Sequence, residues 1–242
     1  MNRKELNQAS KDQLKGNWVW AILLSFVAWL ITYLVSDLMY FINNHNDRVY
    51  NYFKFSQGQL TAAQVTDPGT FSSILNFVSA IVAIMIAWGL AYTILTFRDT
   101  GNKDNVFSGI FSAFTGNKFT SSFLTSLLTM IFTFLWSLLF FIPGIVKAYA
   151  YSMTPYIMKD MYDAGHKMTA TEAITESRKL MNGHKTDLFV LDLSFIGWCL
   201  LGFITLGIGF LWITPYINQT KANFYRKLAG DKFKQAPAKT EE

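Results

Sequence analysis

The sequence predicts an all-α, polytopic membrane protein with six transmembrane helices, arranged as three helical hairpins that are each preceded by an amphipathic interfacial helix. The first reason is composition, because 51% of the residues are hydrophobic and only 15% are charged, whereas a soluble domain carries about 25% charged residues. The second reason is a pattern that occurs three times: a short amphipathic segment, a break containing glycine, and a long apolar run. The breaks are Lys15-Gly16-Asn17, Thr115-Gly116-Asn117 and Asn182-Gly183-His184.

Three apolar runs are long enough to span a bilayer on their own. Residues 18–42 contain Asp37 as their only charge, and residues 71–97 and 119–142 contain none. Because a hydrocarbon core of about 30 Å needs roughly 20 apolar residues in a helix, each run predicts a transmembrane helix with some tilt. A further outgoing run begins at Leu188.

The return arms of the second and third hairpins are shorter. Residues 145–158 include Lys147, and residues 208–217 are followed by polar side chains. Runs of that length are also typical of re-entrant or buried segments. We expect them to span, because each can continue in helix to residue 161 or 224, and the long stems of Lys159 and Lys221 can reach the head groups.

The predicted organisation is a single membrane domain over residues 1–242. Its parts are hairpin repeat 1 over 1–97 with an outer loop over 43–70, hairpin repeat 2 over 98–161, hairpin repeat 3 over 162–228, and a flexible cytoplasmic tail over 229–242.

The distribution of charge predicts the orientation, because loops rich in Lys and Arg stay in the cytoplasm. With the N-terminus inside, all but three of the 21 Lys and Arg residues fall on inner segments, the exceptions being Arg48, Lys54 and Lys147. Both termini are therefore expected in the cytoplasm. The sequence pI near 9.2 then indicates contact with an anionic inner leaflet rather than with nucleic acid.

Each hairpin follows a segment with an apolar stripe at helical spacing. In the third segment, Thr169 lies three residues before Glu172, as in a capping box, and Gly183 follows the last residue of the pattern. These stripes predict helices on the membrane surface that brace the hairpins, with a dedicated partner-binding surface as the alternative. The stripes comprise Leu6, Ala9 and Leu14; Val106, Phe107, Ile110, Phe111 and Phe114; and Ala170, Ala173, Ile174, Ser177, Leu180 and Met181.

The second and third return arms share a motif, since Thr154-Pro155-Tyr156-Ile157 recurs as Thr214-Pro215-Tyr216-Ile217. This repetition suggests an internal repeat derived from one hairpin. Each proline removes a backbone donor, so Pro155 and Pro215 are expected to kink their helices. Broken helices at matching positions of repeats point to a transport site, whereas many prolines in membrane helices serve packing alone.

Three ionisable residues lie within the apolar runs: Asp37, Lys147 and Asp192. A charge at membrane depth is costly, so each is a candidate functional residue. Asp37 and Lys147 fall near the outer surface, where they can be hydrated or pair with each other. Asp192 lies one helical turn from the inner surface and is the strongest of the three, with a hydrogen-bonded structural aspartate as the alternative.

Aromatic residues mark the expected inner edge of the membrane. Trp18, Trp20 and Tyr225 lie at the inner ends of predicted spans. Amphipathic rings collect at the level of the head groups, so these three residues are predicted to be interfacial anchors.

Catalytic motifs are poorly represented. The three histidines are His45, His166 and His184, and none is spaced as in a His-Glu-x-x-His site. Asp160 and Asp163 beside His166 can hold a cation, but solvated loop charges are the preferred interpretation. The single cysteine, Cys199, leaves no internal disulfide. We expect no enzyme activity, no metal ion and no cofactor.

Four segments of the chain carry a resemblance to a known family. They are Leu14-Lys15-Gly16-Asn17-Trp18, Ile142-Pro143-Gly144-Ile145 with Tyr149 and Tyr151, Ser177 to Lys185, and Pro215-Tyr216 to Phe224-Tyr225. They resemble the bacterial family catalogued as domain of unknown function 975. The similarity covers nearly the whole chain and is most specific at the Ser-Arg-x-Leu-Met-x-Gly segment. The resemblance implies a multi-pass protein of the bacterial cytoplasmic membrane, and it implies no catalytic role for any residue.

These features favour a non-catalytic membrane scaffold or accessory factor that binds lipid or a protein partner. The alternative from another class is a small transporter or channel that uses the kinked fourth and sixth helices with Asp192. A weaker third possibility is a membrane enzyme acting on lipid head groups at the inner leaflet. The oligomeric state is not predicted.

Overall fold

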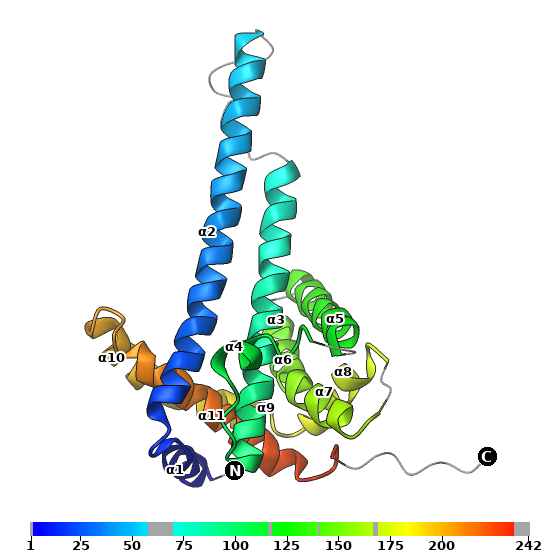
Figure 1. Ribbon diagram of the computed structural model, residues 1–242. Coiled ribbons are helices and arrows are strands. Elements are labelled where there is room, and N and C mark those ends of the chain that lie inside the picture. The colour runs from blue at the N-terminus through cyan, green and yellow to red at the C-terminus, as the bar shows by residue number, and fades with distance from the viewer. Residues whose placement is uncertain (1, 58–69, 116–117, 140, 167–168, 235–242) are drawn as a thin grey trace, which may run out of the picture.

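The computed structural model describes residues 2–57, 70–115, 118–139, 141–166 and 169–234, and the regular secondary structure in these ranges is entirely helical. This confirms the all-α prediction (Figure 1). The helices are α1 (Arg3–Leu14), α2 (Trp18–Ser56), α3 (Thr70–Thr100), α4 (Val106–Ile110), α5 (Lys118–Leu139), α6 (Phe141–Tyr151), α7 (Thr154–Asp163), α8 (Glu172–Leu180), α9 (Lys185–Ser194), α10 (Ile196–Ile204) and α11 (Phe210–Ala229).

The first hairpin is the long pair α2 and α3, which stand side by side (Figure 1). Ala21 and Leu24 of α2 and Met85 and Leu95 of α3 belong to one buried cluster. The outer loop predicted over 43–70 is wrong in its first half, because α2 continues to Ser56. Hydropathy falls after residue 42, but the sequence there holds no glycine or proline that would end a helix.

The second hairpin is formed by α5 and α6, which approach each other closely. A Cβ atom at Gly144 would lie 2.4 Å from Oγ of Ser137, so glycine permits this contact. The helix α6 begins at Phe141, so Pro143 lies in its first turn. Proline is tolerated there because the first N–H groups of a helix have no intrahelical partner.

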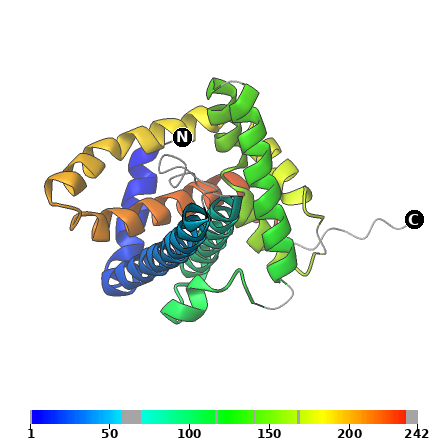
Figure 2. The same ribbon diagram turned by 90° about the horizontal axis from the view of Figure 1, so that it is seen from above.

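The third hairpin consists of α9 and α10 going out and α11 returning. In Figure 2, α2 and α3 are seen nearly end-on, whereas α11 is seen lengthwise in both views. The third hairpin therefore runs across the direction of the first. The predicted tail over 229–242 is partly ordered, because Phe233 is buried and Lys234 forms an ion pair with Asp99; residues 235–242 lie outside the described ranges.

Four stretches are long and apolar enough to cross a membrane: Trp18–His45, Ser73–Thr100, Lys118–Leu138 and Lys185–Ile204, the last of which contains α9 and α10. The chain is thus a multi-pass membrane protein. These four stretches correspond to four of the six predicted spans. The fourth predicted span is divided into α6 and α7 by a break at Ser152-Met153, and the sixth, α11, becomes polar in its second half.

The short helices that precede the hairpins pack against protein. Leu6 and Leu14 of α1 and Ala173 and Ile174 of α8 are buried, so these residues do not face lipid as the stripes predicted. In the second predicted amphipathic segment only the short helix α4 forms, and Phe107 on this helix is 61% exposed. The carboxylate of Glu172 accepts the N–H of Thr169 at 3.3 Å, as in a capping box, although α8 begins two residues later than the motif predicts.

Candidate functional site

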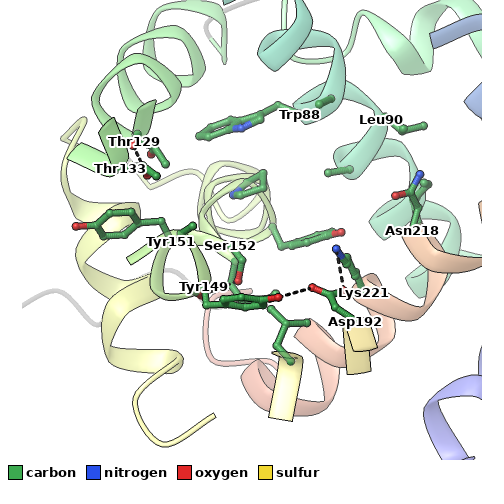
Figure 3. Close-up of a pocket in the computed structure, with 18 residues that line it drawn as sticks. Trp88, Leu90, Thr129, Thr133, Tyr149, Tyr151, Ser152, Asp192, Asn218 and Lys221 are labelled. Carbon is green, nitrogen blue, oxygen red and sulfur yellow. Dashed lines mark hydrogen bonds and ion pairs between the residues drawn. The ribbon is translucent and has the colours of Figure 1, made fainter. Parts of the chain in front are cut away.

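A cavity of about 610 Å³ lies where the three hairpins meet (Figure 3). Its walls come from α3, α5, α6, α7, α9 and α11, and from the Ser152-Met153 break. Clefts of this size that combine a mostly apolar lining with a few convergent polar groups are typical ligand sites. The labelled residues of Figure 3 are Trp88, Leu90, Thr129, Thr133, Tyr149, Tyr151, Ser152, Asp192, Asn218 and Lys221.

One wall of the cavity is polar. Nζ of Lys221 on α11 lies 3.1 Å from Oδ1 of Asp192 on α9, and the hydroxyl of Tyr149 donates to Oδ2 of the same carboxylate at 3.2 Å. The two charged side chains are 35% and 28% exposed, so they face the open side of the cavity. Asn218, one turn before Lys221 on α11, extends this wall. Charge on the wall is balanced, and donors and acceptors are both present.

The opposite wall is apolar. Trp88, Leu90 and Ile94 of α3 line it, together with Met153 at the α6–α7 break. The hydroxyls of the α5 threonines on this side are used within their own helix, Thr133 for example donating to the carbonyl of Thr129 at 2.8 Å. Their methyl groups therefore add to the apolar surface.

The structure brings some of the predicted residues to this cavity and leaves others elsewhere. Asp192 and Pro155 line it. Asp37 is exposed on α2. Lys147 lies over the ring of Trp136, 4.2 Å from its centroid, and it forms no ion pair with Asp37. Asp37 and Lys147 therefore do not pair with each other in the structure.

The two prolines occupy different positions in their helices. Pro155 lies in the first turn of α7, so the expected kink is a complete break between α6 and α7. Pro215 is buried inside α11, which continues on both sides of it. Pro155 costs α7 no intrahelical hydrogen bond, because the first N–H groups of a helix have no partner within it, whereas Pro215 removes the bond to the carbonyl of Leu211.

The three predicted interfacial anchors differ in how deeply they are buried. Trp18 and Trp20 are half-buried at the start of α2, and Nε1 of Trp20 donates to the carbonyl of Asp104 at 2.9 Å. Tyr225 is not an anchor at the membrane surface, because it is fully buried. Its ring stacks on Tyr156 with centroids 5.2 Å apart, and its hydroxyl donates to Asp160 at 2.7 Å.

A buried ionic cluster lies beyond the cavity, and the sequence analysis missed it. The guanidinium of Arg226 donates to both carboxylate oxygens of Asp160, at 2.8 and 2.9 Å, and its Nε donates to Asp99 at 3.1 Å. The side chains of Arg226 and Asp160 are only 5% and 4% exposed. Burial opposes the charge on Arg226, but the carboxylates of Asp160 and Asp99 outweigh it and raise the pKa. The cluster joins α3, α7 and α11, one return arm from each hairpin.

The same region holds α1 in place. Ser10 of α1 accepts hydrogen bonds from Thr220 at 3.0 Å and from Asn223 at 2.9 Å, and Gln13 accepts from Gln219 at 2.7 Å. Oδ1 of Asn223 in turn accepts from Arg98, which extends the polar network to α3. Fully paired networks of this kind fix one arrangement of the helices, because an unpaired buried polar group is costly.

The prediction of solvated loop charges near residue 160 is wrong for Asp160, which is buried against Arg226. Asp163 pairs with Lys118 at 3.1 Å. Burial raises the pKa of Asp163, but hydrogen bonds and charge from Lys159 and Lys118 outweigh it and lower the pKa below its ordinary value. Within the described ranges, no group of three His, Cys, Asp or Glu side chains is placed to hold a metal ion.

Comparison with known proteins identifies a family. The family described as "Protein of unknown function (DUF975)" matches residues 1–150 and residues 138–232. No curated protein and no solved structure matches the chain. Since the two matches together cover nearly all of the sequence, this multi-pass membrane protein belongs to the DUF975 family.

Proposed function

We propose that the protein is a non-catalytic membrane accessory factor that binds a lipid in the cavity between its hairpins. The observation that carries this proposal is the two-sided lining of the cavity. Trp88, Leu90 and Ile94 offer an apolar wall, and Asp192 and Lys221 offer a polar wall facing it. An amphiphile can satisfy both walls at once, because its head group and its hydrocarbon chain need the same two surroundings.

The charge on the polar wall favours a particular head group. Asp192 and Lys221 neutralise each other, so the polar wall has no net charge to compensate that of a charged head group. A zwitterionic phospholipid avoids this cost, since its ammonium can meet Asp192 while its phosphate meets Lys221. The hydroxyl of Tyr149 then supplies a donor at the same place.

We further propose that α6–α7 and α11 also cross the membrane, which gives six crossings, and that both termini lie in the cytoplasm of a bacterial cell. The excess of Lys and Arg on the predicted inner segments supports this orientation. In this arrangement Lys221 lies near the inner leaflet, so a head group can reach it from that side.

The test is native mass spectrometry of the protein gently extracted from its own membrane. Asp192→Asn and Lys221→Gln each remove one charge of the wall, and we expect each variant to lose most of the phospholipid that the wild type retains. The matched control is Asp163→Asn, because Asp163 pairs with lysines outside the cavity. Equal lipid retention by the wild type and both cavity variants would disprove the proposal.

A small transporter remains the second candidate, because Asp192 lines a cavity that is open on one side and is paired with a residue of the proline-containing helix α11. In that case the wild type should hold a small solute or ion that Asp192→Asn loses. Liposomes containing the wild type should then show a flux that the variant lacks. Lipid retention without any flux would exclude this candidate.

A further inference from the structure

A second pocket, with a volume of about 400 Å³, lies on the other side of α11 and shares no lining residue with the first cavity. Its walls are built from the C-terminal end of α1, the start of α2, and the helices α10 and α11. Its lining includes Lys11, Asp12, Lys15, Trp18, Trp198 and Trp212.

Three indole rings line this pocket. Trp198 and Trp212 are 48% and 49% exposed although they lie on apolar helices, and Trp18 is half-buried beside them. An indole has an apolar body and one N–H donor, so it is most stable at the boundary between hydrocarbon and head groups. Three such rings around one pocket suit the glycerol region of a phospholipid, which also joins an apolar part to a polar one.

The opposite side of the pocket is basic. Lys11 and Lys15 are one helical turn apart on α1, both are exposed, and neither forms an ion pair with a described residue. The only acidic group in the lining, Asp12, accepts a hydrogen bond from the Gln8 side chain at 2.9 Å. The pocket therefore has an excess of positive charge and two ammonium groups available to an anion.

The two lysines are held at a fixed position relative to the tryptophans. Ser10 and Gln13, which flank Lys11 on α1, are hydrogen-bonded to Thr220 and Gln219 of α11. Trp212 lies on the same helix α11, two turns earlier. The basic side and the aromatic side thus belong to one rigid junction, and little ordering is needed when a ligand binds.

We propose that this pocket binds the head group of an anionic phospholipid. The phosphate lies between the ammonium groups of Lys11 and Lys15, and the glycerol and first acyl carbons pack on Trp198 and Trp212. Basic pockets between membrane helices on the cytoplasmic side suit anionic head groups, because each ammonium adds favourable electrostatic energy there. This site differs in charge from the neutral cavity proposed above and does not depend on it.

The test measures lipid affinity of the purified full-length protein by native mass spectrometry, with phosphatidylglycerol and phosphatidylcholine as the two probes. The variant Lys11→Gln/Lys15→Gln should bind phosphatidylglycerol about tenfold more weakly and phosphatidylcholine unchanged. Lys11→Arg/Lys15→Arg should retain the wild-type affinity. Trp198→Leu/Trp212→Leu should also weaken phosphatidylglycerol and leave phosphatidylcholine unchanged, since the indoles line this pocket and not the cavity assigned to the zwitterionic lipid.

The matched control is Lys4→Gln/Lys103→Gln, which removes two other exposed positive charges. An equal loss in the control would overturn the proposal, because diffuse surface charge would then explain the binding. Unchanged phosphatidylglycerol affinity in the glutamine variant would overturn it as well, as would displacement of the lipid by inorganic phosphate alone. Because Lys11→Gln/Lys15→Gln should leave phosphatidylcholine binding unchanged, a failure at this pocket can be distinguished from a failure at the cavity.

Discussion

The guanidinium of Arg226 donates to carboxylates of two other hairpins, Asp99 on α3 and Asp160 on α7. Sequence analysis placed Arg226 among the basic residues of the inner surface, because nothing in its neighbourhood distinguishes it from Lys227. Its burial comes from the packing of α11 against two helices that are distant in sequence. Asp192 could be found, in contrast, because a single charge within an apolar run is visible without knowledge of the fold.

We predict that Arg226→Met destabilises the protein by about 3–5 kcal/mol, because it leaves the buried carboxylate of Asp160 without its ionic partner, whereas Asp99 keeps Arg98 and Lys234. The neighbouring residue provides the control. Lys227 is 41% exposed and pairs with Glu5 at the surface, so Lys227→Met should change the stability little. The free energy of unfolding in detergent micelles gives the comparison. Similar values for both variants would show that the cluster does not hold the hairpins together.

The helices themselves were largely predictable, and their ends were not. Hydropathy located the apolar runs of α2, α3 and α5 because lipid requires apolar side chains. It marks the edge of the membrane, however, and not the end of the helix, which is why α2 extends to Ser56 beyond the predicted loop boundary. The stripes predicted helices on the membrane surface, but whether a stripe faces lipid or protein depends on tertiary packing, and Leu6 of α1 and Ala173 of α8 are buried.

Gly89 permits the close approach of α3 and α4. A Cβ atom at Gly89 would lie 1.9 Å from the carbonyl oxygen of Ile110, and the carbonyl of Gly89 accepts a bond from Ser112 at 3.2 Å. We predict that Gly89→Ala destabilises the protein by about 1–3 kcal/mol through overpacking. The loss of stability is measured as a decrease in the melting temperature of the protein in detergent.

Gly197 in α10 is the matched control, since nothing lies within 4 Å of the position of its Cβ. Gly197→Ala should leave the melting temperature unchanged or raise it slightly, because alanine favours a helix by up to about 1 kcal/mol over glycine. Equal destabilisation by both alanines would mean that the α3–α4 contact is not tight.

The arrangement of the three hairpins in the complete molecule was beyond sequence analysis. The pattern predicted six spans of one kind, whereas the third hairpin runs across the direction of α2 and α3 (Figures 1 and 2). Spacing along a chain gives the order of helices, but crossing directions follow from how side chains interlock. The cavity arises from this arrangement, so only single residues of its lining, such as Asp192 and Pro155, could be singled out beforehand.

The position of α8 distinguishes six crossings from four, although both place the termini on the same side. With six crossings α8 is cytoplasmic, and with only the four long spans it lies outside. We predict that Thr175→Cys, in a Cys199→Ser background, reacts with a membrane-impermeant maleimide only after cells are permeabilised. Asn102→Cys should behave alike, whereas Gln57→Cys should react in intact cells. Reaction of Thr175→Cys in intact cells would exclude six crossings.

The length of α2 has a consequence for the side of the membrane at which this helix ends. Its apolar stretch ends at His45, yet the helix continues to Ser56, and at 1.5 Å per residue this adds about 16 Å. Its partner α3 begins only three residues before its own apolar stretch. A lone helix of this length is marginal in water. The end of α2 therefore projects beyond the apolar stretch as a single helix, and contacts with other groups outside the bilayer would determine how rigid it is.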